Sequence, residues 1–180
     1  MDIIKTKIND LILIQPKINL DERGYFFESY QKNKFKDIGI DIDFIQDNES
    51  KSHKGVLRGL HFQIKPFDQG KLVRVINGSV IDVAVDIRKK SLTYGKWFKV
   101  LLSEHNKTMM WIPSGFAHGF ITIENNTIFQ YKCTNYYDKF SERTILWNDE
   151  DLNIDWEFEN PIISDKDMKG IFFKDLDIYF

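Results

Sequence analysis

The sequence predicts an all-β fold of the jelly-roll kind, a sandwich or barrel built from many short strands. The clearest strand lies at residues 81–88, where aliphatic residues alternate with polar or small ones over eight positions. Asn77-Gly78 joins this run to Leu72–Ile76, and Asn-Gly between two such runs is a strong hairpin signal. Similar short runs follow one another along the chain, as is typical of sandwiches and barrels.

The other elements are predicted from the same patterns. Short apolar or alternating runs indicate strands at Leu11–Gln15, Gly24–Tyr30, Phe44–Asp47, Val56–Gln63, Trp97–Ser103, Thr108–Ile112, Gly119–Ile123, Thr127–Thr134 and Thr144–Trp147. Only Lys32–Asp37, which ends before Gly39, and a turn from Ser164 to Lys169 are expected to be helical. Because the pattern contains no linker and no repeat, we expect one domain over residues 1–180.

Composition and charge exclude several classes of protein. The 180 residues include 25 basic and 27 acidic side chains, so a net charge of −2 gives no attraction to nucleic acid or to a membrane surface. The N-terminus is charged, and no apolar run approaches the roughly 20 residues of a membrane span. Cys133 is the only cysteine, which fits a reducing compartment. We therefore expect a cytoplasmic protein that binds neither nucleic acid nor membranes.

Two short motifs resemble the two metal-binding signatures of cupins, but with altered ligands. The first begins with Gly59-Leu60-His61-Phe62-Gln63 and ends at Gly78, and the second is Pro113-Ser114-Gly115-Phe116-Ala117-His118. Gln63 replaces the second histidine of the first signature. Lys71 replaces its glutamate and keeps six residues between itself and Gly78.

The replacement of the glutamate by Lys71 changes the chemistry that the motif can perform. An ammonium group disfavours Fe, Mn or Zn, which need deprotonated N, O or S donors. A lysine beside a histidine suits the removal of a proton next to a ketone, with the ammonium stabilising the enolate. Six lysines and arginines against one acid between Ser50 and Ser79 also favour an anionic ligand. The motif therefore predicts an epimerase or isomerase rather than a metal-dependent oxygenase.

Eight strings of residues carry a more specific resemblance. In chain order they are Asp21–Ser29, Gln46–Asn48, Val56–Gln63, Gln69–Arg74, Asp82–Arg88, Trp111–Pro113, Gly115–Phe120 and Tyr131–Lys132. Together they resemble the dTDP-4-dehydrorhamnose 3,5-epimerase family, and their collinear order is far more specific than any one string. The resemblance implies a cupin-type double-stranded β-helix, or jelly roll, without metal or cofactor. It also implies a homodimer whose N-terminal strands cross to the partner subunit.

The resemblance further implies the reaction and its catalytic residues. The family converts dTDP-4-dehydro-6-deoxy-D-glucose to dTDP-4-dehydro-L-rhamnose in deoxysugar synthesis. C3 and C5 flank the C4 ketone, so a side-chain base can remove a proton and an acid can return one to the opposite face. By resemblance His61 is the base, oriented by Asp167, and Tyr131 is the proton donor. Lys71 is expected to contact the substrate and to stabilise the enolate oxygen.

A further set of residues is expected to bind the substrate. Arg23, Arg58 and Lys166 match positions that hold the diphosphate or the sugar, and guanidinium groups fit phosphate oxygens. Positions that contact the sugar or the nucleobase are matched by Glu28, Gln46, Asp47, Asn48, His118 and Glu142. Because the N-terminal strands cross in this family, Arg23 and Glu28 are expected to serve the partner's site.

Several alternatives stay open at this level. Tyr131 lies on an alternating face where core packing is the ordinary role, and Ser164-x-x-Asp167 has the form of a helix cap. An ideal strand would point Arg58 and His61 to opposite faces, unless Gly59 forms a bulge. The alternative functions are an epimerase for one carbon or for another nucleotide sugar, a binding cupin without activity, and a metal-dependent oxygenase.

Overall fold

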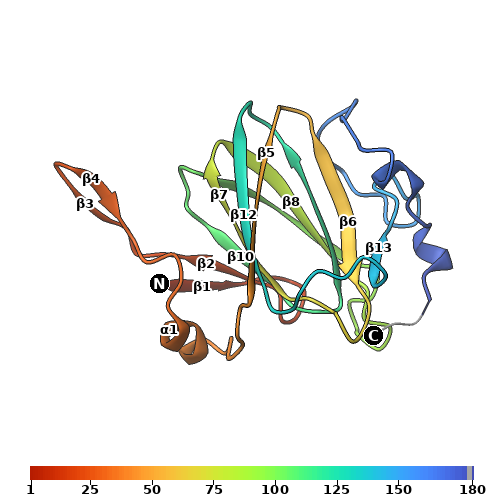
Figure 1. The fold of residues 1–180 in the computed structure, drawn as a ribbon, viewed down its shortest axis with the longest axis horizontal. Coiled ribbons are helices and arrows are strands. Elements are labelled where there is room, and N and C mark those ends of the chain that lie inside the picture. The colour runs from red at the N-terminus through yellow and green to blue at the C-terminus, as the bar shows by residue number, and fades with distance from the viewer. Residues whose placement is uncertain (178–179) are drawn as a thin grey trace.

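The computed structural model describes residues 1–177 and 180, and two antiparallel sheets that face each other form its body (Figure 1). The first sheet contains, in spatial order, β1 (Asp2–Lys5), β2 (Ile12–Gln15), β10 (Met109–Ile112), β7 (Lys71–Asn77), β12 (Thr127–Cys133) and β5 (Gln46–Ser52). The second contains β13 (Glu142–Thr144), β6 (Leu57–Gln63), β11 (Phe116–Thr122), β8 (Ser79–Asp86) and β9 (Trp97–Ser103). The predicted all-β jelly roll is confirmed.

A hairpin and a few short helices lie outside the two sheets. β3 (Asn19–Asp21) and β4 (Gly24–Phe26) pair with each other and project away from the body (Figure 1). The predicted helix is confirmed as α1 (Lys32–Asp37), and the predicted turn ends in the 3-10 helix η1 (Asp167–Lys169). A second 3-10 helix, η2 (Phe173–Asp175), follows it. Across the described residues, no helix is long and apolar enough to cross a membrane.

Three apolar clusters hold the layers together. Between the sheets, Phe129 of β12 stacks on Phe120 of β11 with ring centroids 4.1 Å apart. The C-terminal segment covers the outer face of the second sheet, where Trp156 joins the cluster that includes Val83. Phe35 of α1 covers the outer face of the first sheet. Burial of each such side chain stabilises the fold by about 1.5–3 kcal/mol. The clusters show that both outer faces of the sandwich are covered, one by the C-terminal segment and the other by α1.

The side chains of β8 alternate between the outer and the inner face of the second sheet. All eight of its residues are buried. Ile81, Val83 and Val85 pack under the C-terminal segment. Because successive side chains alternate between faces, Asp82 and Ala84 point into the space between the sheets. The polar phase of this strand therefore faces the interior of the jelly roll.

Several predicted boundaries were wrong. The strand predicted at Phe44–Asp47 runs instead over Gln46–Ser52, because its inward residues are polar and give no hydrophobic alternation. The strand predicted at Gly24–Tyr30 ends at Phe26, and the one predicted at Thr144–Trp147 lies at Glu142–Thr144. β1 and β3 were not predicted, since their exposed residues form short runs without a buried face.

A register shift in β6 confirms the bulge considered at Gly59. On the neighbouring β11, His118 pairs with His61 and Phe120 pairs with Arg58. Three steps along β6 therefore match two along β11, which is the definition of a bulge. The shift lets Arg58 and His61 turn to the same side of the strand. Gly59 adopts a φ of +137°, which a side chain would disfavour.

We expect replacement of Gly59 by alanine to destabilise the fold. A Cβ there would lie 2.5 Å from the Cα of Gly119, and the positive φ adds about 1–3 kcal/mol of strain. Since about 1 kcal/mol changes the Tm of a chain this size by roughly 2–4 °C, the strain alone should lower Tm by roughly 2–12 °C, and the close contact should add to that loss.

Gly24→Ala is the matched control for this measurement. Its φ is also positive, at +122°, but an added Cβ would meet nothing within 4 Å. Thermal melts at one protein concentration should therefore show a smaller loss for Gly24→Ala. Equal losses for the two variants would contradict the close approach of Gly59 and Gly119.

Candidate functional site

One pocket between the two sheets brings together most of the predicted catalytic residues. His61 of β6, Lys71 of β7 and Tyr131 of β12 all line a cavity of about 130 Å³. Its remaining lining residues are Gln46, Asn48, Phe62, Gln63, Gln69, Tyr137 and Glu142. His61 comes from the second sheet, whereas Lys71 and Tyr131 come from the first. The two sheets therefore supply opposite walls of the pocket.

His61 is held by Asp167 from the C-terminal segment. Nε2 of His61 lies 2.7 Å from Oδ1 of Asp167, and the backbone N–H of Gly59 donates to Oδ2 at 3.3 Å. Burial raises the pKa of the Asp167 carboxyl, but its hydrogen bond to His61 and the nearby charges lower it overall. Asp167 therefore stays ionised beside the imidazole.

Only half of the predicted capping box of Ser164 forms, because η1 begins after Lys166 and has no side-chain cap of its own. The backbone N–H of Asp167 donates to the Oγ of Ser164 at 3.2 Å. The side chain of Asp167 is left for His61 and Gly59. The hydrogen bond to Ser164 therefore helps to hold the backbone from which the carboxylate reaches β6.

Lys71 is a buried cation between the sheets. Its exposed fraction is 9%, and Nζ donates to the backbone carbonyl of His61 at 3.4 Å. Burial lowers the pKa of its ammonium group, while Cys133 and the carboxylates of Asp82 and Glu142 oppose that change. Its remaining N–H donors are available to a ligand in the pocket.

Tyr131 faces His61 from the other wall. It pairs with Asn48 of β5 on one side and with Val73 of β7 on the other. Burial raises the pKa of its phenol to about 12. The hydroxyl is therefore a neutral donor throughout the physiological pH range.

His118 is the one expected binding residue that lies behind the pocket, where Asp82 holds one of its ring nitrogens. Its side chain is buried outside the lining of this pocket, with Nε2 lying 2.9 and 3.0 Å from the two carboxylate oxygens of Asp82. Burial lowers the pKa of His118, and the carboxylate opposes that change. Asp82 therefore occupies one ring nitrogen of His118, and only the other is open to a ligand.

Glu142 and Lys166 lie together at the rim. Nζ of Lys166 is 2.5 Å from Oε1 of Glu142, and the hydroxyl of Tyr137 donates to Oε2 at 2.9 Å. Burial raises the pKa of the Glu142 carboxyl, but these two hydrogen bonds lower it overall. On the facing edge, Gln46 and Asn48 bond to each other at 3.0 Å. Four expected substrate-binding residues therefore surround the opening.

Four other expected binding residues lie outside the pocket. Arg23 and Glu28 lie on or beside the projecting hairpin, where they pair with Asp21 and Lys34. Asp47 points to the outer side of β5 and pairs with Lys132. Arg58 is exposed and donates to the Oγ of Ser52 at 3.3 Å, on the edge beyond the pocket.

The sequence analysis gave no site role to Asp82, which lies behind the pocket, or to the lining residues Phe62, Gln63, Gln69 and Tyr137. Asp82 holds His118, and its signal was an acid in the polar phase of an otherwise apolar strand. Gln69 and Tyr137 line the pocket from irregular segments. Periodicity gives no signal for such positions, because their placement depends on how two loops meet.

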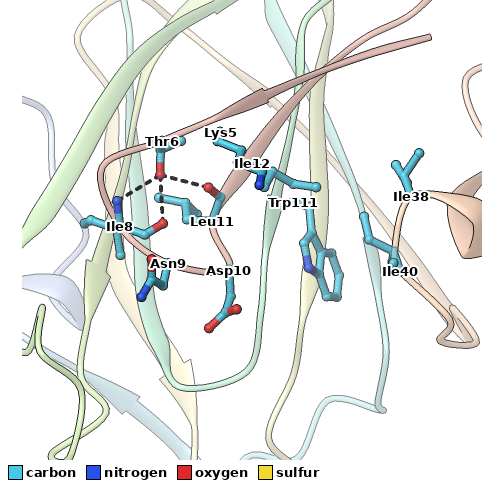
Figure 2. Close-up of a pocket in the computed structure, with 11 residues that line it drawn as sticks. Lys5, Thr6, Ile8, Asn9, Asp10, Leu11, Ile12, Ile38, Ile40 and Trp111 are labelled. Carbon is cyan, nitrogen blue, oxygen red and sulfur yellow. Dashed lines mark hydrogen bonds between the residues drawn. The ribbon is translucent and has the colours of Figure 1, made fainter.

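A larger cavity does not carry comparable chemistry. It measures about 470 Å³ and lies between the loop joining β1 to β2 and the segment after α1 (Figure 2). The Oγ1 of Thr6 is engaged by Ile8 and Leu11, as Figure 2 shows. Its acid, Asp10, is exposed and bonds to Arg88. Among the residues that the structure describes, no three His, Cys, Asp or Glu side chains gather so as to hold a metal ion.

The fold and the pocket define a cupin-type jelly-roll protein with a histidine–aspartate pair facing a tyrosine and a buried lysine. The family model described as dTDP-4-dehydrorhamnose 3,5-epimerase matches residues 5–175, and the chain belongs to this family of isomerases. The resemblance inferred from the sequence is therefore confirmed.

Individual relatives support the same assignment. A dTDP-4-dehydrorhamnose 3,5-epimerase of Shigella flexneri is 52% identical, and the match covers 99% of each chain. The crystal structure of a Legionella pneumophila dTDP-6-deoxy-D-glucose-3,5-epimerase in complex with dTDP-4-keto-L-rhamnose is 48% identical with a TM-score of 0.94, covering 98% of this chain and 94% of that one. ChmJ, a 3'-monoepimerase from Streptomyces bikiniensis in complex with dTDP-quinovose, is 28% identical with a TM-score of 0.88, covering 94% and 86%.

We expect Tyr131 to ionise well above an ordinary phenol, whose pKa is about 10. Because burial raises its pKa to about 12, the neutral phenol stabilises the fold fully below about pH 10. That contribution is lost as the pH rises through the folded pKa. Ultraviolet absorbance should be titrated at alkaline pH for the wild type and for Tyr131→Phe. The difference between the two curves isolates the ionisation of Tyr131, which should occur near pH 12. Tryptophan emission followed in parallel confirms that the protein is folded. A Tyr131 component near pH 10, with none near pH 12, would contradict the prediction.

Proposed function

We propose that this protein is a dTDP-4-dehydrorhamnose 3,5-epimerase that inverts C3 and C5 of dTDP-4-dehydro-6-deoxy-D-glucose. The observation that carries the proposal is the placement of His61 and Tyr131 on opposite walls of one pocket. Inversion at a carbon needs a base on one face of the sugar ring and a proton donor on the other. The buried, unpaired Cys133 supports action in a reducing compartment, the cytoplasm.

Each inversion begins with His61. The ring nitrogen that does not face Asp167 takes the proton from the carbon next to the ketone. Asp167 accepts a hydrogen bond from the other nitrogen, which holds the tautomer and stabilises the imidazolium that forms. The electron pair of the broken C–H bond moves onto the ketone oxygen as an enolate.

Lys71 and Tyr131 complete the inversion. The Lys71 ammonium donates to the enolate oxygen, and loss of one such donor typically costs on the order of 10²–10³ in rate. As the enolate collapses back to the ketone, the Tyr131 hydroxyl delivers its proton to the carbon from the opposite face. Solvent then restores the proton of Tyr131 and removes the one on His61. The same groups act at the second carbon.

We also propose that the active form is a homodimer whose hairpins complete each other's sites. The pocket of about 130 Å³ is smaller than the roughly 300–1,000 Å³ of typical small-molecule sites, so the nucleotide must extend beyond it. The hairpin exposes Leu20, Tyr25 and Phe26 by 78%, 56% and 68%, and an exposed apolar patch of this kind marks an interface. Arg23 and Glu28 on this element would then bind the nucleotide of the neighbouring protomer.

Deuterium uptake from D2O tests the reaction. Incubation with dTDP-4-dehydro-6-deoxy-D-glucose in D2O, coupled to a reductase that traps the product, should give dTDP-rhamnose deuterated at both C3 and C5 by NMR. Uptake at one carbon would overturn the 3,5 assignment in favour of a monoepimerase. Absence of uptake at both carbons would overturn the epimerase proposal itself.

Two variants give this experiment its controls. His61→Asn keeps a polar side chain but cannot accept a proton, so uptake should slow by about 10²–10⁴. Tyr131→Phe keeps the base and loses the opposite donor, so deuterium should enter the substrate without inversion. Inversion at the wild-type rate in either variant would contradict the assigned roles.

A mixing experiment tests the crossed hairpins. Arg23→Ala and His61→Ala protomers should each be nearly inactive alone. If the hairpin serves the partner's site, a mixed dimer contains one site with both lesions and one with neither. After mixing and exchange at equal amounts, activity should recover to about a quarter of the wild-type value. No recovery, with mixed dimers verified by mass spectrometry, would place Arg23 in the site of its own chain.

A further inference from the structure

Gln63 occupies the position of the second cupin histidine, and its amide is used in full. It lies at the end of β6 with an exposed fraction of 5%. Its Nε2 donates to the backbone carbonyls of Phe67 at 2.5 Å and Tyr136 at 3.0 Å. Its Oε1 accepts from the backbone N–H of Asp138 at 2.7 Å. Both N–H donors therefore point at backbone groups and not at the pocket centre.

The three bonds join two irregular segments that form one wall of the pocket. One segment is the loop from β6 to β7, which includes Phe67 and Gln69. The other is residues 134–141, between β12 and β13, which includes Tyr137. The two segments meet elsewhere as well, because Gln69 donates to the carbonyl of Asn135 at 2.8 Å.

Apolar packing contributes little to the position of residues 134–141. Tyr136, Tyr137 and Phe140 are exposed by 60%, 52% and 86%. A segment with so little buried surface is held chiefly by its hydrogen bonds. The buried amide of Gln63 supplies two of them directly to the backbone of this segment.

We propose that Gln63 is a positioning residue for the sugar-binding wall of the pocket. It acts through Tyr137 and Glu142, which are bonded to each other at 2.9 Å, and does not touch the reacting carbons. The proposal rests on the proposed function for the identity of the substrate. It also explains why an amide suits this position, since a neutral imidazole offers one donor and one acceptor where two donors and one acceptor are used.

The proposal predicts a separation of binding from chemistry. His61, Lys71 and Tyr131 are fixed by strand pairing, so they should keep their positions when Gln63 is replaced. Gln63→Met should raise KM roughly tenfold, equivalent to about 1.4 kcal/mol, and change kcat by less than about threefold. Amide hydrogen exchange in the ligand-free variant should accelerate within residues 64–69 and 134–141, but not in β6, β7 or β12.

Gln15→Met is the matched control. The Gln15 amide also makes two hydrogen bonds, to the carbonyl of Asn106 and from the hydroxyl of Thr108, both at 2.8 Å. It lies on β2, outside the lining of the pocket. Its loss should leave KM and exchange at residues 134–141 unchanged. Should Gln63→Met fail to fold, Gln63→Glu keeps the shape, turns both donors into acceptors, and carries the same expectation.

The outcomes distinguish this inference from the proposed function. Exchange in the ligand-free protein is independent of the substrate, so an inactive wild type would refute the epimerase proposal alone. Unchanged exchange at residues 134–141 in both Gln63 variants would overturn the positioning role. A higher KM with unchanged exchange would likewise overturn it and make Gln63 a direct substrate contact. A fall in kcat of about a hundredfold at constant KM would assign it to the chemistry instead.

Discussion

The register shift of β6 at Gly59 is the constraint on which the rest of the pocket depends. It lets Arg58 and His61 turn to the same side of their strand. It also directs the Gly59 N–H to Oδ2 of Asp167, whose other oxygen holds His61. One distortion therefore positions the imidazole and its carboxylate together. Its cost is a backbone contact with Gly119 so close that it leaves no room for a side chain.

The electrostatics of the site follow from the exchange of a carboxylate for Lys71. A buried ammonium is unfavourable, and Asp82 and Glu142 offset only part of that cost, since burial still lowers the pKa of Lys71. Asp82 also bonds His118, so a single acid stabilises two of the basic groups between the sheets. In the proposed reaction, negative charge develops on the ketone oxygen beside a cation that is already desolvated and fixed. Such a donor stabilises the transition state without reorganisation at the moment of reaction.

Hydrophobic periodicity predicted the elements whose side chains pack, and it failed where inward residues are polar. Trp97–Ser103 and Lys32–Asp37 were predicted with their observed bounds. The bounds of β5 were predicted wrongly because its inward residues, Asn48, Ser50 and Ser52, are polar. The strand that borders the pocket therefore has no apolar face. The pocket members on strands could be predicted from motifs. Asp82 as the partner of His118 depends on strand register, and Tyr137 depends on loop contacts, neither of which is encoded in local spacing.

The catalytic residues and the groups proposed to bind the substrate are held in place by different kinds of structure. His61, Lys71 and Tyr131 lie on strands whose ladders fix them on both sides, and acid–base catalysis needs that precision because misplacement by a fraction of an ångström weakens proton transfer. The groups proposed to recognise the substrate lie on the hairpin and on residues 134–141, which have few buried side chains. Side-chain hydrogen bonds such as those of Gln63 hold the latter. Substitutions in these irregular segments can therefore alter substrate preference while the acid, the base and the enolate-binding lysine keep their positions.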